Sequence, residues 1–265
     1  MAALEREAGT QLFTRTGRGV SLTPAGGIFL GHARSGLDSI DQGSRAVAQY
    51  LLGRSGSLSL GCATSAATHL LPQVLQGYVA RHPDIDLRVR TGRSLEVLAM
   101  LEQRAVDVAL VRLEVRRPDV TAEGVLREAV WLVAPPHHPL ARRDEVLRAA
   151  DLRGSSLLAY YRESDFWAQV YGAAEQAAGP LHRAMELDSL DAVRSMALAG
   201  LGLAFLPYST VQRDVAQGRL CRLQVLDLVL PERVTSIARR ADTPFAGPVQ
   251  EIWTQIADGY GRGVG

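Results

Sequence analysis

The sequence predicts an α/β fold with two similar lobes, preceded by one long helix. The first observation behind this prediction is that short apolar strands alternate with helices in two rounds, which is typical of parallel sheets. The second is a segment from Pro24 to Leu52 without a further proline and with heptad apolar spacing. A chain of 265 residues with 47% hydrophobic and 22% charged content is globular by composition and long enough for these parts.

The long helix is expected to begin at Thr23-Pro24, because Thr can cap a helix and Pro fits the first helical position. Its apolar positions recur at alternating spacings of three and four, which predicts a coiled-coil dimer seam. The alternative is an amphipathic helix that lies on its own domain. The dimerisation candidates are Leu30, Leu37, Ile40, Val47 and Leu51, with Ala33 and Ser44 completing the seam.

Two rounds of alternating elements follow the linker at 53–57. The first has strands at 58–61, 85–90 and 106–111 and helices at 68–81 and 95–104; the second has strands at 156–161, 183–187 and 203–206 and helices at 164–178 and 189–199. Extended runs at 129–136 and 233–238 lie between the rounds and before a last helix at 245–260. If that helix packs on the first lobe, two strands cross between the lobes and a cleft forms at the hinge.

These elements divide the chain into three parts: residues 1–23, a linker or dimerisation helix at 24–52, and a ligand-binding domain at 56–265. Within that domain, lobe I is expected at about 56–133 and 240–265 and lobe II at about 134–239. The hinge is expected near Ala134-Pro135 and Ile237-Ala238.

Polar residues follow the strands of both lobes, where ligands of open α/β sheets bind. Hydroxyls at a helix N-terminus can hold an anion, although plain N-capping explains them equally well. Arg93 can neutralise an acidic ligand or lie in solvent, and Tyr160 can face the cleft or the core. The candidate binding residues are Thr64, Ser65, Thr91, Gly92, Arg93, Ser94, Tyr160, Asp188 and Ser189.

The sequence gives little support to an enzymatic, metal-binding or membrane-bound function. The sequence has no P-loop, G-x-S-x-G or H-E-x-x-H pattern, and Gly200-x-Gly202 precedes a strand where a dinucleotide site would follow one. Cys62 and Cys221 lie far apart outside any metal motif. We expect no catalytic residue, no metal and no cofactor. With no signal peptide and no long apolar segment, a cytoplasmic protein without a membrane partner is expected.

Residues 1–23 are too few for a core of their own, and two short apolar runs around a basic turn predict a hairpin there. In order and spacing, the whole chain resembles the LysR-type transcriptional regulators. The resemblance runs through Leu4-Glu5-Arg6-Glu7-Ala8-Gly9, Leu12-Phe13, Arg15, Arg18, Val20, Leu22-Thr23, Ala25-Gly26, Leu70-Leu71-Pro72, His82-Pro83, Asp107-Val108-Ala109-Leu110, Ala134-Pro135, His138-Pro139-Leu140 and Ala199-Gly200-Leu201-Gly202-Leu203-Ala204-Phe205-Leu206-Pro207.

The resemblance implies a two-lobed effector domain of the type 2 periplasmic-binding-protein kind, preceded by a long linker helix and a partial winged helix. It places effector contacts at the four polar loops and DNA-backbone contacts at Arg6, Arg15 and Arg18. In the family roughly one more helix pair precedes the position of Leu4, so Met1 falls within the recognition helix. We therefore expect residues 1–23 to be a remnant of the winged helix-turn-helix, with DNA reading impaired in the chain as given.

The resulting hypothesis is an effector-responsive transcriptional regulator, not an enzyme. Its expected partners are a small anionic effector such as a carboxylate, promoter DNA if the head is complete, and a second copy of the chain in a dimer or tetramer. A ligand would act through its different affinities for two arrangements of the lobes or dimer. The alternative is a stand-alone cytoplasmic small-molecule-binding protein of the same two-lobed fold.

Overall fold

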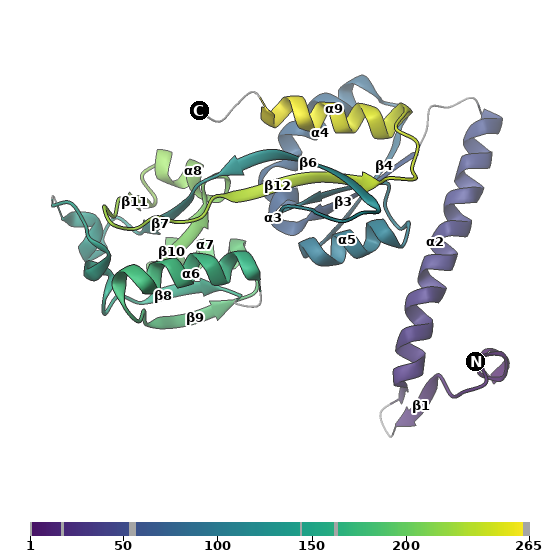
Figure 1. Ribbon diagram of the computed structural model, residues 1–265, viewed down its shortest axis with the longest axis horizontal. Helices are drawn as coiled ribbons and strands as arrows, with labels where there is room; N and C mark the ends of the chain where they lie inside the picture. The colour runs from purple at the N-terminus through teal and green to yellow at the C-terminus, as the bar shows by residue number, and fades with distance from the viewer. Residues whose placement is uncertain (1, 17–18, 53–56, 144, 162–163, 262–265) are drawn as a thin grey trace.

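The computed structural model describes residues 2–16, 19–52, 57–143, 145–161 and 164–261. A two-lobed body lies beside one long helix, α2 (Pro24–Leu52), whose limits are those predicted from the sequence (Figure 1). The N-terminal part, at the end of α2 away from the body's linker, consists of α1 (Ala2–Ala8) and a hairpin of β1 (Phe13–Thr16) and β2 (Gly19–Leu22). None of the described helices combines the length and apolar character needed to span a bilayer.

The N-terminal part is held to α2 by a few specific contacts. Thr23 Oγ1 accepts the Gly26 N–H at 2.9 Å and donates to the Gln11 carbonyl at 2.8 Å, which caps α2 as predicted. Gly26 lies against the Leu12 backbone, where an added Cβ would come within 2.0 Å of the carbonyl oxygen. Gly26 is therefore required by the close approach of two backbones. Glu5 adds a further contact, because its carboxylate accepts the N–H groups of Leu12 and Phe13.

Helix α2 also contacts the body. Both terminal nitrogens of Arg90 donate to the Asp38 carboxylate at 3.0 Å, and Ser35 donates to Gln103 at 3.3 Å. Leu37 and Ile40 of the predicted seam are each 66% exposed. The side chains of Val47 and Leu51 lie outside the described residues. Among the described seam positions, Leu37, Ile40 and Ser44 are thus exposed in a single chain, while Leu30 and Ala33 are half-buried.

Lobe I contains a five-stranded sheet in the order β4-β3-β5-β12-β6. Its strands are β3 (Ser57–Ala63), β4 (Asp86–Gly92), β5 (Val108–Val111), β6 (Val120–Glu128) and β12 (Arg233–Arg240). One face packs on α4 (Leu71–Arg81) and α9 (Gly247–Gly261) and the other on α5 (Ser94–Glu102), while the short α3 (Thr64–His69) follows β3 (Figure 1). The last helix therefore does pack on lobe I.

Lobe II has the corresponding sheet, in the order β11-β7-β10-β8-β9. Its strands are β7 (Val130–Ala134), β8 (Leu157–Tyr160), β9 (Arg183–Leu187), β10 (Leu203–Pro207) and β11 (Cys221–Leu223). Its helices are α6 (Asp165–Ala178), α7 (Leu190–Leu198) and α8 (Tyr208–Ala216), with 3-10 turns η1 (Pro139–Arg142) and η2 (Ala149–Leu152). Trp167, Tyr171 and Phe205 are the large aromatic side chains of its core.

Each lobe takes one antiparallel strand from outside its own round. β12 pairs with β5 and β6 in lobe I, and β7 pairs with β10 and β11 in lobe II. The chain therefore crosses between the lobes at Ala129 and again at 224–232. The hinge was expected a few residues later in each case, at Ala134-Pro135 and Ile237-Ala238. The expected lobe limits of 133 and 240 also lie after these crossings. The prolines after β7 end a strand that already belongs to lobe II.

Several elements depart from the predicted pattern. Strands β6 and β11, helix α8 and the turns η1 and η2 were not predicted, and the expected helix at 68–81 is two helices, α3 and α4. Pro72 lies at the start of α4, where a missing N–H costs nothing, so the sequence supports a new helix start there.

We expect the exposed seam of α2 to support self-association. Leu37→Glu with Ile40→Glu should shift the chain toward the monomer, because two charges would face the partner helix. Sedimentation velocity over a range of concentrations measures the shift. Ile28→Glu is the control, since Ile28 is 70% exposed and lies nine residues before Leu37, on the opposite side of the helix. Equal self-association of the double variant and the parent would contradict the seam.

Candidate functional site

A cavity of about 570 Å³ lies between the lobes, beyond the carboxyl ends of their parallel strands. Its lining includes all but one of the residues predicted to bind ligand. Thr91 is the exception: it lies within β4, one residue before the cavity wall. Those that line it are Thr64, Ser65, Gly92, Arg93 and Ser94 from lobe I and Tyr160, Asp188 and Ser189 from lobe II.

The lobe I loops are held by hydrogen bonds that use part of each polar side chain. Thr64 Oγ1 donates to the Gly92 carbonyl at 3.2 Å, which joins the ends of β3 and β4. Ser94 Oγ accepts the Arg112 N–H at 3.0 Å, and Glu96 accepts the Arg93 N–H at 2.8 Å. Ser94 therefore has a structural role and still has its own hydroxyl proton to donate.

On the lobe II side, too, residues that line the cavity also stabilise the local structure. Ser189 Oγ accepts the Ala192 N–H at 3.3 Å and so caps α7. Tyr160 is half-buried, with its ring 5.6 Å from that of Trp167, so it contacts both the core and the cavity. Arg93 from lobe I reaches over the ring of Tyr161 at 4.4 Å, which brings the two walls together at the cavity edge.

Arg233 is a functional candidate that the sequence analysis missed. It begins β12, lines the cavity and is only 7% exposed. Its guanidinium packs on the lobe II rings of Phe166 and Trp167, at 5.6 and 5.5 Å. Burial, with Arg112 nearby, lowers the pKa of Arg233 to about 9, so it remains charged at neutral pH. Among the described residues, its Nε and Nη1 have no hydrogen-bond partner.

Arg112 is the second missed residue, and it differs because it is paired. It donates to Thr235 Oγ1 at 2.8 Å and to the carboxylate of Glu128, and the side chains of this ion pair are each 1% exposed. The other Glu128 oxygen accepts the Ser209 N–H of lobe II at 2.7 Å. Two buried guanidinium groups thus share one carboxylate, which leaves this end of the cavity with a formal charge of +1.

A signal for Arg112 was available in the sequence. The argument that singled out the loops after β3 and β4 applies equally to the loop after β5, and Arg112 is the first residue of that loop. Arg233 gave no comparable signal. Every basic residue in this chain is Arg, so the residue type alone did not distinguish it.

A second contact between the lobes lies beside the cavity. His69 at the end of α3 forms a 2.9 Å hydrogen bond with Asp191 in the first turn of α7. Burial lowers the pKa of His69, aided by Arg194 and Arg112 and opposed by Asp191. His69 is thus held toward its neutral form.

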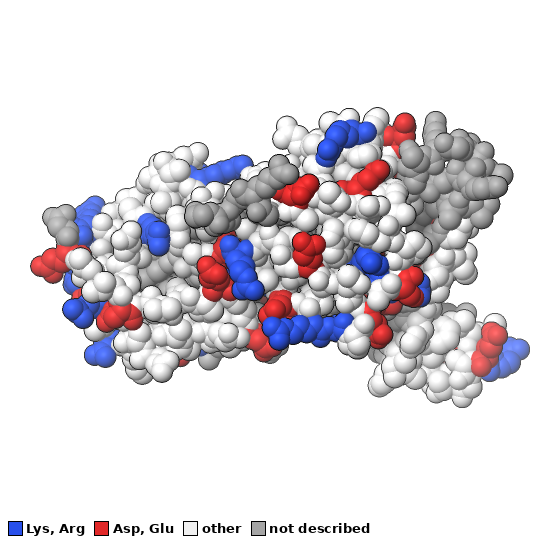
Figure 2. Space-filling view, turned by 45° about the horizontal axis from the view of Figure 1, so that its top comes forward, with Lys and Arg blue, Asp and Glu red and all other residues white. Residues whose placement is uncertain are grey.

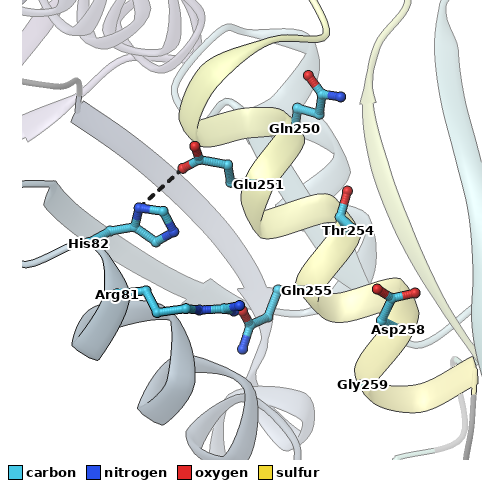
Figure 3. A pocket seen from close by; sticks show the side chains of 8 residues that line it. All are labelled: Arg81, His82, Gln250, Glu251, Thr254, Gln255, Asp258 and Gly259. Carbon is cyan, nitrogen blue, oxygen red and sulfur yellow. Dashed lines mark ion pairs between the residues drawn. The ribbon is translucent and has the colours of Figure 1, made fainter.

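Another cavity of about 520 Å³ lies between the end of α4 and α9 (Figure 3). Polar side chains from the two helices border it, and His82 Nδ1 lies 3.3 Å from Glu251. Gln255 is directed back into the lobe, where its amide donates to the Val74 carbonyl at 3.0 Å. This cavity involves no strand end and none of the predicted binding residues, so the interlobe cavity is the better candidate.

The face of the molecule shown in Figure 2 has no large region of a single charge. On the face shown in Figure 2, acidic and basic side chains lie close to one another along the middle of the molecule. Of the predicted DNA-contacting residues, Arg6 is exposed on α1 and Arg15 lies in β1 opposite Val20, while Arg18 lies outside the described residues. The three are therefore not shown to form a common surface.

Neither cysteine is placed for thiol chemistry in the cavity. Cys62 lies buried in β3, and burial raises the pKa of its thiol to about 12. Cys221 is half-buried in β11, in the other lobe. Both are free thiols.

Comparison with known proteins agrees with this architecture. Residues 52–260 match the LysR substrate binding domain, and residues 1–27 match the bacterial regulatory helix-turn-helix protein, lysR family. The chain is 29% identical to the transcriptional dual regulator GltC of Bacillus subtilis, over 79% of this chain and 70% of GltC. It is 33% identical to a probable hydrogen peroxide-inducible genes activator of Mycobacterium avium, over 83% of this chain and 71% of that protein.

Solved structures share the fold over nearly the whole chain. Full-length CbnR in complex with its target DNA superimposes with a TM-score of 0.72 and 20% identity, covering 99% of this chain and 87% of CbnR. The likeness therefore includes α2 and the N-terminal part as well as both lobes.

Removing the shared carboxylate should strongly destabilise the chain. Glu128→Ala leaves Arg112 buried without a counterion and the Ser209 N–H unpaired, and we expect a loss of about 3–5 kcal/mol in the free energy of unfolding. Urea unfolding measures it. Glu102→Ala, which breaks an exposed ion pair with Arg117, should cost less than about 1 kcal/mol. Similar losses in the two variants would contradict the role given to Glu128.

His69 should make folding stability depend on pH. Its folded-state pKa lies below the ordinary value of 6.5, so the unfolded chain binds the proton more readily. The contribution of neutral His69 to the free energy of unfolding is full above pH 6.5 and is lost as the pH falls below that value. We expect His69→Gln to reduce the drop in unfolding free energy on acidification, while the exposed His32→Gln leaves it unchanged. Equal drops in all three proteins would disprove this.

Proposed function

Because the chain belongs to the LysR family of bacterial transcriptional regulators, we propose that its interlobe cavity binds a small effector through an anionic group. The family assignment rests on matches that together span residues 1–27 and 52–260. The relatives with assigned roles are regulators, which supports a regulatory role over an enzymatic one. What has to be argued from this chain's own residues is the chemistry of the effector.

The observation that carries the proposal is the buried guanidinium of Arg233, whose Nε and Nη1 have no hydrogen-bond partner among the described residues. A buried charge is costly unless it is paired and hydrogen-bonded. The nearby carboxylate of Glu128 is already bonded to Arg112 and Ser209. A carboxylate or phosphate group in the cavity would supply the missing charge and acceptors, and guanidinium binds such groups with two parallel hydrogen bonds.

The remaining lining suits a small polar molecule. The volume of about 570 Å³ lies within the range of ligand pockets, about 300–1,000 Å³. Hydroxyl groups of Ser65, Ser94 and Ser189 come from both lobes and can each donate one proton. Phe166 and Leu95 add apolar surface. A ligand with one anionic group and additional polar atoms would therefore touch both lobes at once.

Contact with both lobes supports a switching role. A ligand changes a conformational equilibrium only by the difference in its affinity for the two states. Arg233 belongs to a lobe I strand and packs on lobe II rings, so an anion bound there favours one relative placement of the lobes. In the regulator we propose, that change reaches promoter DNA through paired α2 helices and the N-terminal hairpin. CbnR, with the same fold, has been solved on its target DNA.

A stand-alone binding protein of the same fold is the alternative. It leaves unexplained why residues 1–27 match a helix-turn-helix and why Leu37 and Ile40 are exposed along a helix that precedes the lobes. Both features have a use in a DNA-binding dimer. We therefore favour the regulator.

The role of Arg233 can be tested with acetate, succinate and inorganic phosphate as probes, by calorimetry and thermal unfolding. Arg233→Met should weaken binding of the best probe by about 10-fold or more, which corresponds to one charged hydrogen bond of ~1.5–3 kcal/mol. Without probe, the variant should be as stable as the parent or more so, since it no longer buries an unpaired charge.

Arg222→Met is the matched control. Arg222 also stacks on an aromatic ring, that of Trp131 at 4.5 Å, but it lies in β11 outside the cavity. Its substitution should leave probe binding unchanged. If Arg233→Met binds all probes as well as the parent does, the anion site is not at Arg233.

A further inference from the structure

We propose that the effector is a zwitterion, such as an amino acid, with its carboxylate on Arg233 and its ammonium group facing Asp188 and Asp165. This inference rests on the proposed function and narrows it to a ligand class. It follows from the way charge is distributed over the two walls of the cavity.

The lobe I wall accepts one negative charge. Arg112 forms the ion pair with Glu128, and Arg233, whose charge Glu128 offsets only in part, has no ion pair of its own among the described residues. Arg93 is exposed at the edge of the cavity, over Tyr161 and next to Glu96, whose carboxylate holds the Arg93 N–H. One carboxylate therefore completes the buried charge on this side.

The lobe II wall carries the opposite charge. Asp165 is the first residue of α6, and Asp188 lies between β9 and the α7 cap. Both line the cavity and are exposed, and among the described residues neither has an ion-pair or hydrogen-bond partner. Asp191 on the same wall differs, because it is bonded to His69. Two carboxylates thus border the cavity without an ion-pair partner in the part of the chain that the structure describes.

Helix capping explains Asp165 in part but not Asp188. An acid in the first turn of α6 is favoured by the helix dipole whether or not a ligand binds. Asp188 precedes α7, and Ser189 already accepts the N–H that a cap must satisfy. The acid at Asp188 is therefore free to meet a cationic group, and it is the stronger of the two candidates.

The two walls together favour one ligand class. A dicarboxylate would satisfy Arg233 with one end and place its second negative charge toward Asp188 and Asp165. A molecule with one carboxylate and one ammonium group instead places a charge of opposite sign at each wall. Repulsion between the second carboxylate of a dicarboxylate and the two Asp side chains would therefore discriminate against that ligand.

The test uses the full chain and a panel of the twenty common amino acids, each beside its analogue without the α-amino group and, where available, its amine without the carboxylate. Binding is measured by calorimetry after a thermal-shift screen. We expect the best amino acid to bind at least about 10-fold more tightly than its deaminated analogue, as a charged hydrogen bond would give. The amine alone should not bind detectably.

Variants assign each end of the ligand. Asp188→Asn should reduce the advantage of the amino acid over its deaminated analogue, and Asp165→Asn should do so to a smaller extent. Arg233→Met should weaken both members of the pair. Asp84→Asn, which removes an exposed acid in the turn before β4, is the control and should change nothing.

The outcomes separate this inference from the proposed function. If deaminated acids bind as tightly as amino acids, and binding still depends on Arg233, the anion site stands and the zwitterion is wrong. If no amino acid in the panel binds, or if Asp188→Asn leaves the preference for the amino group unchanged, the inference is also wrong. If nothing that binds depends on Arg233, both proposals fail.

Discussion

The arrangement of the cleft depends on how one buried carboxylate is shared. Glu128 lies where the chain leaves lobe I, and its two oxygens are bonded to Arg112 of lobe I and to the Ser209 N–H of lobe II. Both oxygens already have partners, and no described ion pair joins Glu128 to Arg233, its cross-strand neighbour, so Arg112 and Arg233 share this one negative charge. The same interaction therefore joins the lobes at the crossing and leaves one positive charge in the cavity between them. Under the proposed function, the anion of the effector would supply the second negative charge that this network lacks.

The connection from the cavity to the linker helix is short. Strand β4 ends at the cavity with Gly92, and Arg90, two residues earlier, forms the paired contact with Asp38 of α2. Helix α5 begins at the cavity with Ser94, and Gln103 at its other end contacts Ser35 of α2. A shift of either ligand loop thus acts on α2 through elements that are themselves packed and rigid. Coupling of this kind needs a physical link with two arrangements, and these two contacts are candidates for such links.

The sequence identified local features well and pairings between distant segments poorly. Thr23-Pro24 and the lack of a later proline set the limits of α2, and the rule about strand ends placed the polar loops of both lobes at one cavity. The sequence did not show that β7 joins the sheet of lobe II and β12 the sheet of lobe I. A strand's own residues do not say which sheet it joins. The unpaired state of Arg233 depends on Glu128 being used elsewhere, which only the folded chain shows.

A buried guanidinium without a counterion is a cost that the ligand-free protein bears. Solvent or a different lobe placement can reduce that cost by letting water reach Arg233, whereas an anion removes it while the lobes stay as they are. Under the proposed function, the protein with and without its effector would therefore prefer different lobe arrangements, and the difference would arise at Arg233. This is the differential affinity that a ligand needs in order to act as a switch. It also explains why a methionine at position 233 would be more stable and less responsive at the same time.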